Sequence, residues 1–357
     1  MSTSFSRLNS VFENATNSYK YYWWLSILKL IKTNGNEKLE LEDIVFEMLA
    51  FVWYPINYYK ISLGKQDQLT GYVKEIKVCF NLPDQIDDVK LIDFLKENRK
   101  TPLIKSIIKK VLMYVPFRFI RPWYHETKGM LDHTVNDYII FLQKDIKRDL
   151  PYIIEGDFIL MNSKWLDFIS SNHTLIENAA LLELFKYVEK NNPLLINISL
   201  KLFKPKTRKL AKATKLWKRF IGVQGHLHKS VFEENQLNQI NQLSIDHFLP
   251  WSFLTHDLIW NLHPVNKSVN SSKSNCLPKI SFFKQFYYLQ YNFCNFLLTE
   301  KINKPLENYY NLFNCSNEEL ISLSKEQFII RMGHFYTPQY ETAKNMGFNY
   351  DWNLNAL

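Results

Sequence analysis

The chain has 357 residues, of which 46% are hydrophobic and 15% aromatic, and it carries a formal net charge of +9 at pH 7. This length predicts two domains or three, and the apolar content excludes an intrinsically disordered chain. The apolar stretch 19–31 contains Lys20 and Lys29, is shorter than the ~20 residues of a membrane span, and lacks the layout of a secretory signal. We therefore expect a soluble, cytoplasmic protein with no membrane partner.

The cysteines argue against a structural zinc site. They are scattered through the sequence and form no CxxC pair, the spacing typical of such sites. We expect reduced thiols at all four positions: Cys79, Cys276, Cys294 and Cys315.

Positive charge is concentrated in two stretches of the chain. Residues 201–230 hold ten lysines and arginines and no acid, which leaves the rest of the chain nearly neutral in sum. A second stretch, 96–121, has eight basic residues against one acid, Glu97. Polyanions are the natural partners of such surfaces. The charge distribution therefore predicts a nucleic acid as the partner.

The N-terminal two hundred residues carry helical patterns. Apolar periodicity predicts buried helices at 19–31 and 42–59. Pro55 should end or kink the second, because an interior proline loses a hydrogen bond and clashes with the preceding turn. Further helices are expected at 89–99, 103–114, 134–147 and 174–190. We interpret 1–200 as a helical domain that could recognise a substrate or a partner, a choice that the sequence leaves open.

A sharper pattern from 207 to 221 predicts an amphipathic helix. At ~100° per residue, four basic residues fall on one narrow face: Arg208, Lys212, Lys215 and Arg219. Apolar and small residues lie roughly opposite: Leu210, Thr214, Trp217 and Ile221. One face can pack while the other contacts phosphate, so we predict a nucleic-acid-binding stripe. The alternative is an ordinary solvated face.

The stretch from Leu243 to Pro278 has the order strand, loop, strand, helix. Residues 243–249 alternate apolar and polar positions, as in a strand, and Pro250 ends them. Residues 259–265 form a second strand candidate, and 266–273 a short helix with Asn266 as its N-cap. Asn270 and Lys273 are three residues apart and share a helix face. Packed across the strands, that face would point toward Asp246 and His247.

This pattern resembles the ββα-metal unit of the HNH endonucleases. The matching features are Asp246-His247, a central Asn261, and Asn270-x-x-Lys273 ahead of Leu-Pro. The spacing is especially similar to the HNH domain of RNA-guided CRISPR effector nucleases, and the resemblance covers about 40 of the 357 residues. It implies a mainly α chain with a small α+β catalytic unit. The expected layout is a helical domain at 1–200, a basic helix and connector at 201–230, the nuclease domain at 231–290 and a C-terminal helical extension at 291–357.

The resemblance also implies a role for each residue. His247 would be the base that activates water, at an open site where packing does not need it. Asp246 and Asn270 would offer oxygen ligands to Mg²⁺ or Mn²⁺. Asn261 would hold the His247 segment, and Lys273 would counter charge on the phosphate. An asparagine in place of the last motif histidine removes a nitrogen ligand and favours Mg²⁺ over zinc.

Three interpretations of function remain open. The first is a metal-dependent DNA endonuclease of restriction or anti-phage defence, with DNA preferred by resemblance alone. The second is an RNA-cleaving nuclease or toxin with the same centre, since the ββα-metal unit neither needs nor excludes a 2′-hydroxyl. The third is a nucleic-acid-binding protein with a degenerate unit, in which the Asp-His pair and the asparagine are structural. A protein partner or a homo-oligomer is compatible with all three.

Overall fold

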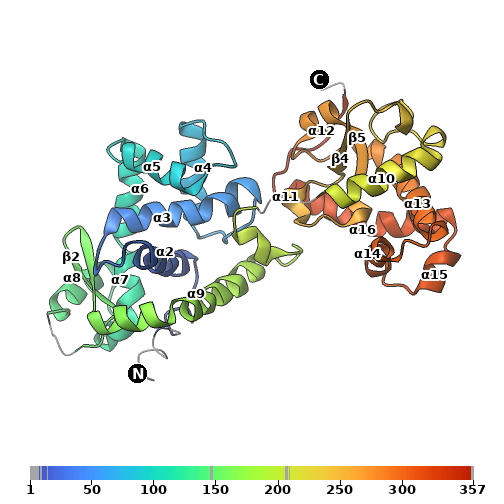
Figure 1. Cartoon of the computed structure of the whole chain (residues 1–357). Coiled ribbons are helices and arrows are strands. Elements are labelled where there is room, and N and C mark those ends of the chain that lie inside the picture. The colour runs from blue at the N-terminus through green and yellow to red at the C-terminus, as the bar shows by residue number, and fades with distance from the viewer. Residues whose placement is uncertain are drawn as a thin grey trace. The chain divides into compact units, whose positions relative to one another are not determined.

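A computed structural model describes residues 8, 10–13, 15–144, 148–205, 208 and 210–354 (Figure 1). The chain is mainly helical, as expected, and divides into two compact units, Met1–Lys204 and Pro205–Leu357. The boundary expected at 290 falls in the middle of a continuous helix, α13 (Phe283–Thr299). The basic helix, the nuclease segment and the C-terminal helices therefore form one unit.

Unit 1 contains the expected helices and a small sheet that the sequence did not predict. The sheet has the antiparallel order β1-β3-β2, with Leu39 opposite Ile159 and Ile153 opposite Leu160. Its strands are only three or four residues long, too short for a clear alternation. The elements are α2 (Tyr19–Asn34), β1 (Lys38–Glu40), α3 (Leu41–Trp53), η1 (Tyr54–Tyr58), α4 (Leu69–Cys79), α5 (Asp88–Glu97), α6 (Pro102–Leu112), α7 (Val115–Ile120), η2 (Arg121–Trp123), η3 (His125–Thr127), α8 (Asp132–Leu142), β2 (Tyr152–Glu155), β3 (Phe158–Met161), α9 (Ser163–Asn191) and η4 (Ile198–Leu202).

Local chemistry explains several element ends in unit 1. Helix α3 gives way at Trp53 to the π-helical turn η1 containing Pro55, since proline cannot continue the α-helical hydrogen bonds. Helix α9 begins eleven residues before the expected residue 174, because the Asn162 side chain caps it by accepting from the Lys164 N–H at 3.0 Å. The helix expected at 134–147 is α8; residues 145–147 lie outside the described residues.

The basic stretch 96–121 includes a strongly amphipathic helix, α6. Its isoleucines Ile104 and Ile107 are buried, whereas Lys105 and Lys109 are exposed. Apolar burial therefore orients this helix and leaves lysines at the surface of unit 1. Among the described residues, no helix combines the length and the apolar character needed to cross a membrane.

Unit 2 holds the predicted strand, loop, strand, helix order. Strands β4 and β5 pair antiparallel, and the helices α12 and α10 each contact both strands (Figure 1). The elements are α10 (Ala211–Gln224), η5 (Gly225–Leu227), η6 (Leu237–Gln239), β4 (Leu243–His247), α11 (Trp251–Leu254), η7 (Ile259–Asn261), β5 (Leu262–Asn266), α12 (Lys267–Lys273), η8 (Ile280–Phe282), α13 (Phe283–Thr299), α14 (Asn303–Phe313), α15 (Asn317–Ser322) and α16 (Lys325–Asn345).

Aromatic stacking ties the hairpin to the C-terminal helices of unit 2. Phe248, just after β4, stacks on Phe286 of α13 with centroids 3.9 Å apart. Trp217 of α10 stacks on Phe293 of the same helix at 3.7 Å. Such pairs add about 0.5–1.5 kcal/mol each beyond the area they bury. Helix α13 is thus a shared support for the basic helix and for the hairpin.

Candidate active site

The β4–β5 hairpin fixes the position of the Asp-His pair. Asp246 lies opposite His263, and His247 lies opposite Leu262. Neighbouring residues of a strand point to opposite faces, so the Asp246 and His247 side chains leave β4 in different directions. Both are almost fully buried, with 4% and 3% of their surface exposed. The expectation of an open site for His247 is therefore wrong in this structure.

Helix α12 packs on the Asp246 face of the hairpin, as its residue spacing predicted. The Asn270 side chain donates from Nδ2 to Ser244 Oγ at 2.7 Å and to the Ile245 carbonyl at 3.3 Å. These bonds attach the helix to the strand one and two residues ahead of Asp246. The amide oxygen Oδ1 of Asn270 accepts no hydrogen bond from a described residue. It is therefore available to a ligand.

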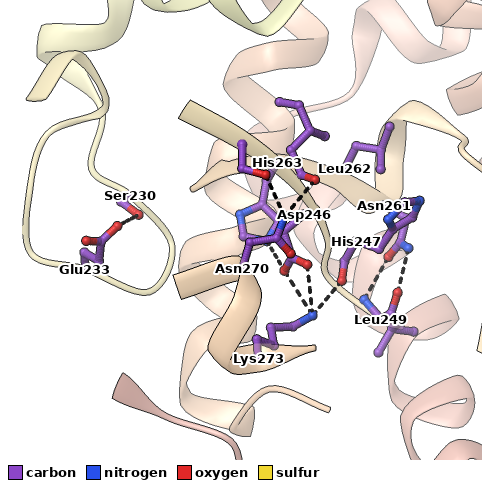
Figure 2. Close-up of polar contacts among 12 residues, drawn as sticks. Ser230, Glu233, Asp246, His247, Leu249, Asn261, Leu262, His263, Asn270 and Lys273 are labelled. Atoms are coloured by element: carbon purple, nitrogen blue, oxygen red, sulfur yellow. Dashed lines mark hydrogen bonds and ion pairs between the residues drawn. The ribbon is translucent and has the colours of Figure 1, made fainter. Parts of the chain in front are cut away.

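Lys273, one helical turn further on, extends into the interior (Figure 2). Its Nζ lies 3.3 and 3.0 Å from the two carboxylate oxygens of Asp246 and donates to the His247 carbonyl at 2.7 Å. Lys273 has no solvent exposure. Its ammonium is thus directed to Asp246 and to the main chain of His247, and the expected contact with phosphate is not available to it in this arrangement.

The carboxylate of Asp246 is stabilised by two buried cationic or polar groups. His263 Nε2 lies 3.3 Å from Oδ2, and His263 has no solvent exposure. Burial alone raises the pKa of Asp246, but the Lys273 ammonium and the His263 ring outweigh it and hold that pKa below its usual value. Asp246 is therefore ionised at neutral pH although it is buried.

Asn261 holds the segment that follows His247. Its Oδ1 accepts from the Leu249 N–H at 3.0 Å, and its Nδ2 donates to the Leu249 carbonyl at 2.9 Å (Figure 2). Its own carbonyl accepts from the Phe248 N–H at 2.8 Å. Three hydrogen bonds therefore fix the two residues after His247 to the start of β5. Asn261 therefore constrains the backbone that follows His247.

The imidazole of His247 is directed to a residue that the sequence analysis missed. Its Nε2 lies 2.8 Å from Oδ1 of Asp257, in the segment between α11 and η7. Burial lowers the pKa of His247, and the carboxylates of Asp257 and Asp246 oppose this effect without cancelling it. The ring is therefore neutral at pH 7, the state that a base needs.

Helices of the expected C-terminal extension support the hairpin directly. Gln290 of α13 donates to the Leu262 carbonyl at 2.8 Å, and Tyr309 of α14 donates to Gln290 at 2.6 Å. Tyr336 of α16 donates to the Trp260 carbonyl at 2.9 Å and lies 3.3 Å from Asn261 Oδ1. These side chains are buried. The site therefore depends on residues well beyond the motif.

The predicted basic stripe is only partly realised. Helix α10 begins at Ala211, so Arg208 precedes it and does not share its face; residues 207 and 209 lie outside the described residues. Lys212, Lys215 and Arg219 are exposed on α10 while Trp217 is buried. Arg219 pairs with Glu300, which reduces the charge available to a ligand.

Arg208 instead lies near Trp251, and its charge acts on the proposed base. Its guanidinium is 5.8 Å from the ring centroid of Trp251. Its charge acts on both His247 and Asp257 and lowers the pKa of each. An arginine at this place can contact a phosphate next to the imidazole.

Asp246 and Asn270 carry oxygen atoms of the type that a hard divalent ion binds. Asp246 Oδ2 accepts no well-aligned hydrogen bond from a described residue, and Asn270 Oδ1 is free as described above. One carboxylate and one amide oxygen are ligands that Mg²⁺ prefers. No group of three or more His, Cys, Asp or Glu side chains forms a metal site in the described parts of the chain. Water and phosphate would therefore complete the coordination.

A hairpin and a helix that carry an aspartate, a histidine and an asparagine form a ββα unit in this segment. Residues 230–279 match the family model described as HNH endonuclease. The resemblance of this segment to the HNH endonucleases is thereby confirmed, and the domain indicates a nuclease. No curated protein and no solved structure matched the chain.

Sequence reasoning missed Asp257, His263 and Tyr336 for different reasons. Asp257 lies in the inter-strand loop, ten residues after His247, where no periodicity marks it. His263 lies in the second expected strand, and its pairing with Asp246 depends on the strand register. Tyr336 lies 75 residues from Asn261. Only the carboxylate of Asp257 offered a chemical signal, as a potential partner for a histidine.

Proposed function

We propose that this chain is a metal-dependent endonuclease that hydrolyses phosphodiester bonds of DNA. The observation that carries the proposal is the geometry of one ββα unit, in which Asp246, His247 and Asn270 are held by β4 and α12. The match of residues 230–279 to the HNH endonuclease family supports it. A role in restriction or anti-phage defence is a further proposal that rests on resemblance.

In this mechanism His247 removes a proton from the attacking water. The ring is neutral at pH 7 because burial lowers its pKa, so it can accept a proton. Asn261 holds the backbone after His247 and so keeps the imidazole in one place. Asp246 and Asn270 would hold the divalent ion, which when bound stabilises negative charge on the phosphoryl and leaving oxygens.

Lys273 has a different role in this proposal from the one its spacing predicted. Its ammonium contacts Asp246 and the His247 carbonyl inside the unit. We assign it the function of keeping Asp246 ionised and in place. Contact with the phosphate is assigned to Arg208, whose charge acts on both His247 and Asp257.

The proposal is tested by incubating the purified protein with plasmid, single-stranded DNA and RNA, each with Mg²⁺, Mn²⁺ or EDTA. We expect DNA to be cut with Mg²⁺ or Mn²⁺ and not with EDTA. Cleavage of RNA alone would favour the second candidate function, an RNase or toxin. Binding of nucleic acid with no cleavage under any condition would favour a degenerate unit.

The metal prediction concerns Asp246→Ala and Asn270→Ala. Both variants should need more Mg²⁺ for half-maximal cleavage, and Asp246→Ala should have the larger effect because it removes a charged ligand. The measurement is cleavage rate against Mg²⁺ concentration, with Asn311→Ala as a control at an exposed asparagine of α14. An unchanged Mg²⁺ requirement in both site variants would rule out these ligands.

The binding prediction concerns Arg208, Lys212, Lys215 and Arg219. Removal of all four charges should weaken binding to every sequence alike, because phosphate contacts position without specifying. Each lost contact should flatten the slope of log K against log salt by about 0.9 on duplex DNA. We expect Arg219 to contribute least, since it already pairs with Glu300.

The slope is measured by DNA titration at several ionic strengths. Lys304→Gln, on the exposed surface of α14, is the matched control and should leave the slope as in the parent. A quadruple variant with the parental slope would identify the basic face as merely solvated.

A further inference from the structure

Asp257 occupies a fixed place at the end of the His247 side chain. Its segment follows α11, whose C-cap Thr255 has a left-handed φ of 59° and donates its N–H to the Trp251 carbonyl at 2.6 Å. Beyond it, the Ile259 N–H donates to Asn308 Oδ1 at 3.0 Å. The backbone is therefore anchored two residues before and two residues after Asp257. Such anchoring keeps the carboxylate where the imidazole can meet it.

The contact determines which ring nitrogen of His247 can act as a base. A carboxylate has oxygen acceptors and no hydrogen to donate to the ring. The hydrogen of the neutral ring must therefore lie on Nε2, which is 2.8 Å from Asp257 Oδ1. The free lone pair then lies on Nδ1.

We propose that Asp257 is the positioning residue of this centre: it accepts the Nε2 hydrogen bond of His247, fixes the ring and leaves Nδ1 as the atom that takes the proton from water. The inference rests on the proposed nuclease function. In the reaction, the water proton moves to Nδ1 and the water oxygen forms a bond to phosphorus. The bond from phosphorus to the leaving oxygen breaks, and that oxygen takes a proton from solvent. The Nε2 proton stays between the ring and Asp257, whose charge stabilises the imidazolium.

Two other charged side chains act on the same ring. Asp246 is the neighbouring residue on β4, and Arg208 approaches from the segment ahead of α10. Asp246 already contacts Lys273 and His263, and the Arg208 guanidinium can only donate. Among the described residues, Asp257 is therefore the acceptor that orients His247 Nε2.

The variants that test this are Asp257→Ala and Asp257→Asn, with Glu307→Gln as a control at an exposed acid of α14. Asp257→Ala should lower the single-turnover cleavage rate by on the order of 10- to 100-fold without weakening DNA binding. Asp257→Asn should recover part of the rate, because its amide oxygen can still accept from Nε2 while the charge is gone. Glu307→Gln should cleave as the parent does.

A second readout does not depend on cleavage. Nitrogen-15 chemical shifts of the His247 ring, assigned among the nine histidines with His247→Gln, report which nitrogen carries the hydrogen. We expect hydrogen on Nε2 in the parent and a mixture of tautomers in Asp257→Ala.

The possible failures can be told apart. Parental cleavage by Asp257→Ala, or a parent ring with its hydrogen on Nδ1, would overturn the role of Asp257 and leave the nuclease assignment intact. A parent and a Glu307→Gln control that both fail to cut any nucleic acid would overturn the proposed function, and the role of Asp257 with it.

Discussion

Replacement of His247 by alanine should reduce cleavage by on the order of 10² to 10⁴ while DNA binding persists, because a positioned base contributes rate and not affinity. The expected result is a single-turnover rate near the background at saturating protein and DNA. The dissociation constant for DNA, measured with EDTA present, should remain close to that of the parent. This split between rate and affinity separates a base from a phosphate-binding residue.

The burial of His247 requires a control for this experiment. Because only 3% of the residue is exposed, truncation to alanine leaves a cavity and lowers stability as well as rate. Glutamine in His247→Gln fills more of the space than alanine and also lacks a base. This variant should therefore be as inactive as His247→Ala but more stable than it. Thermal unfolding of both variants gives the comparison. Cutting near the parental rate by either folded variant would refute the assignment of His247.

Replacement of Lys273 by methionine should destabilise unit 2 by about 3–5 kcal/mol, the range for removing one partner of a buried ion pair. The reason is that Asp246 would remain buried without the ammonium that lies 3.0 Å from it. The measurement is urea unfolding in EDTA at neutral pH. The double variant Asp246→Asn/Lys273→Met leaves no unpaired charge and should regain part of the loss. A Lys273→Met variant that unfolds at the same urea midpoint as the parent would show that the ion pair is not needed for stability.

Acidification should reduce the difference in unfolding free energy between the Lys273→Met variant and the parent. The pair holds the pKa of Asp246 below its usual value in the folded state. Its stabilisation is therefore present above the unfolded value, about 3.9, and is lost as pH falls through the folded value. In the variant, burial without the ammonium raises that pKa, so protonation relieves the unpaired charge.

Mg²⁺ should stabilise the variant more than the parent if the ion binds Asp246, because it can replace the missing positive charge.

Local sequence patterns were sufficient to predict the type of unit. Alternation through 243–247, the prolines that stop it and the three-residue spacing of Asn270 and Lys273 are local properties, so they specify strand, strand and helix without tertiary information. The same holds for the helices of unit 1, whose apolar periodicity is strong. The ends of the elements were predicted less accurately. The second strand begins at Leu262, because the first three residues of the expected strand form η7.

Tertiary structure alone decided which groups the site residues meet. The strand register places His263 against Asp246, and the packing of α12 turns Lys273 inward to the same carboxylate. The loop path brings Asp257 to His247, and α16 brings Tyr336 to Asn261. These contacts join residues up to 75 positions apart, and no local pattern encodes such distances. A pattern of residue types predicts the chemistry available, whereas the partners that set charge, tautomer and access follow from packing in three dimensions.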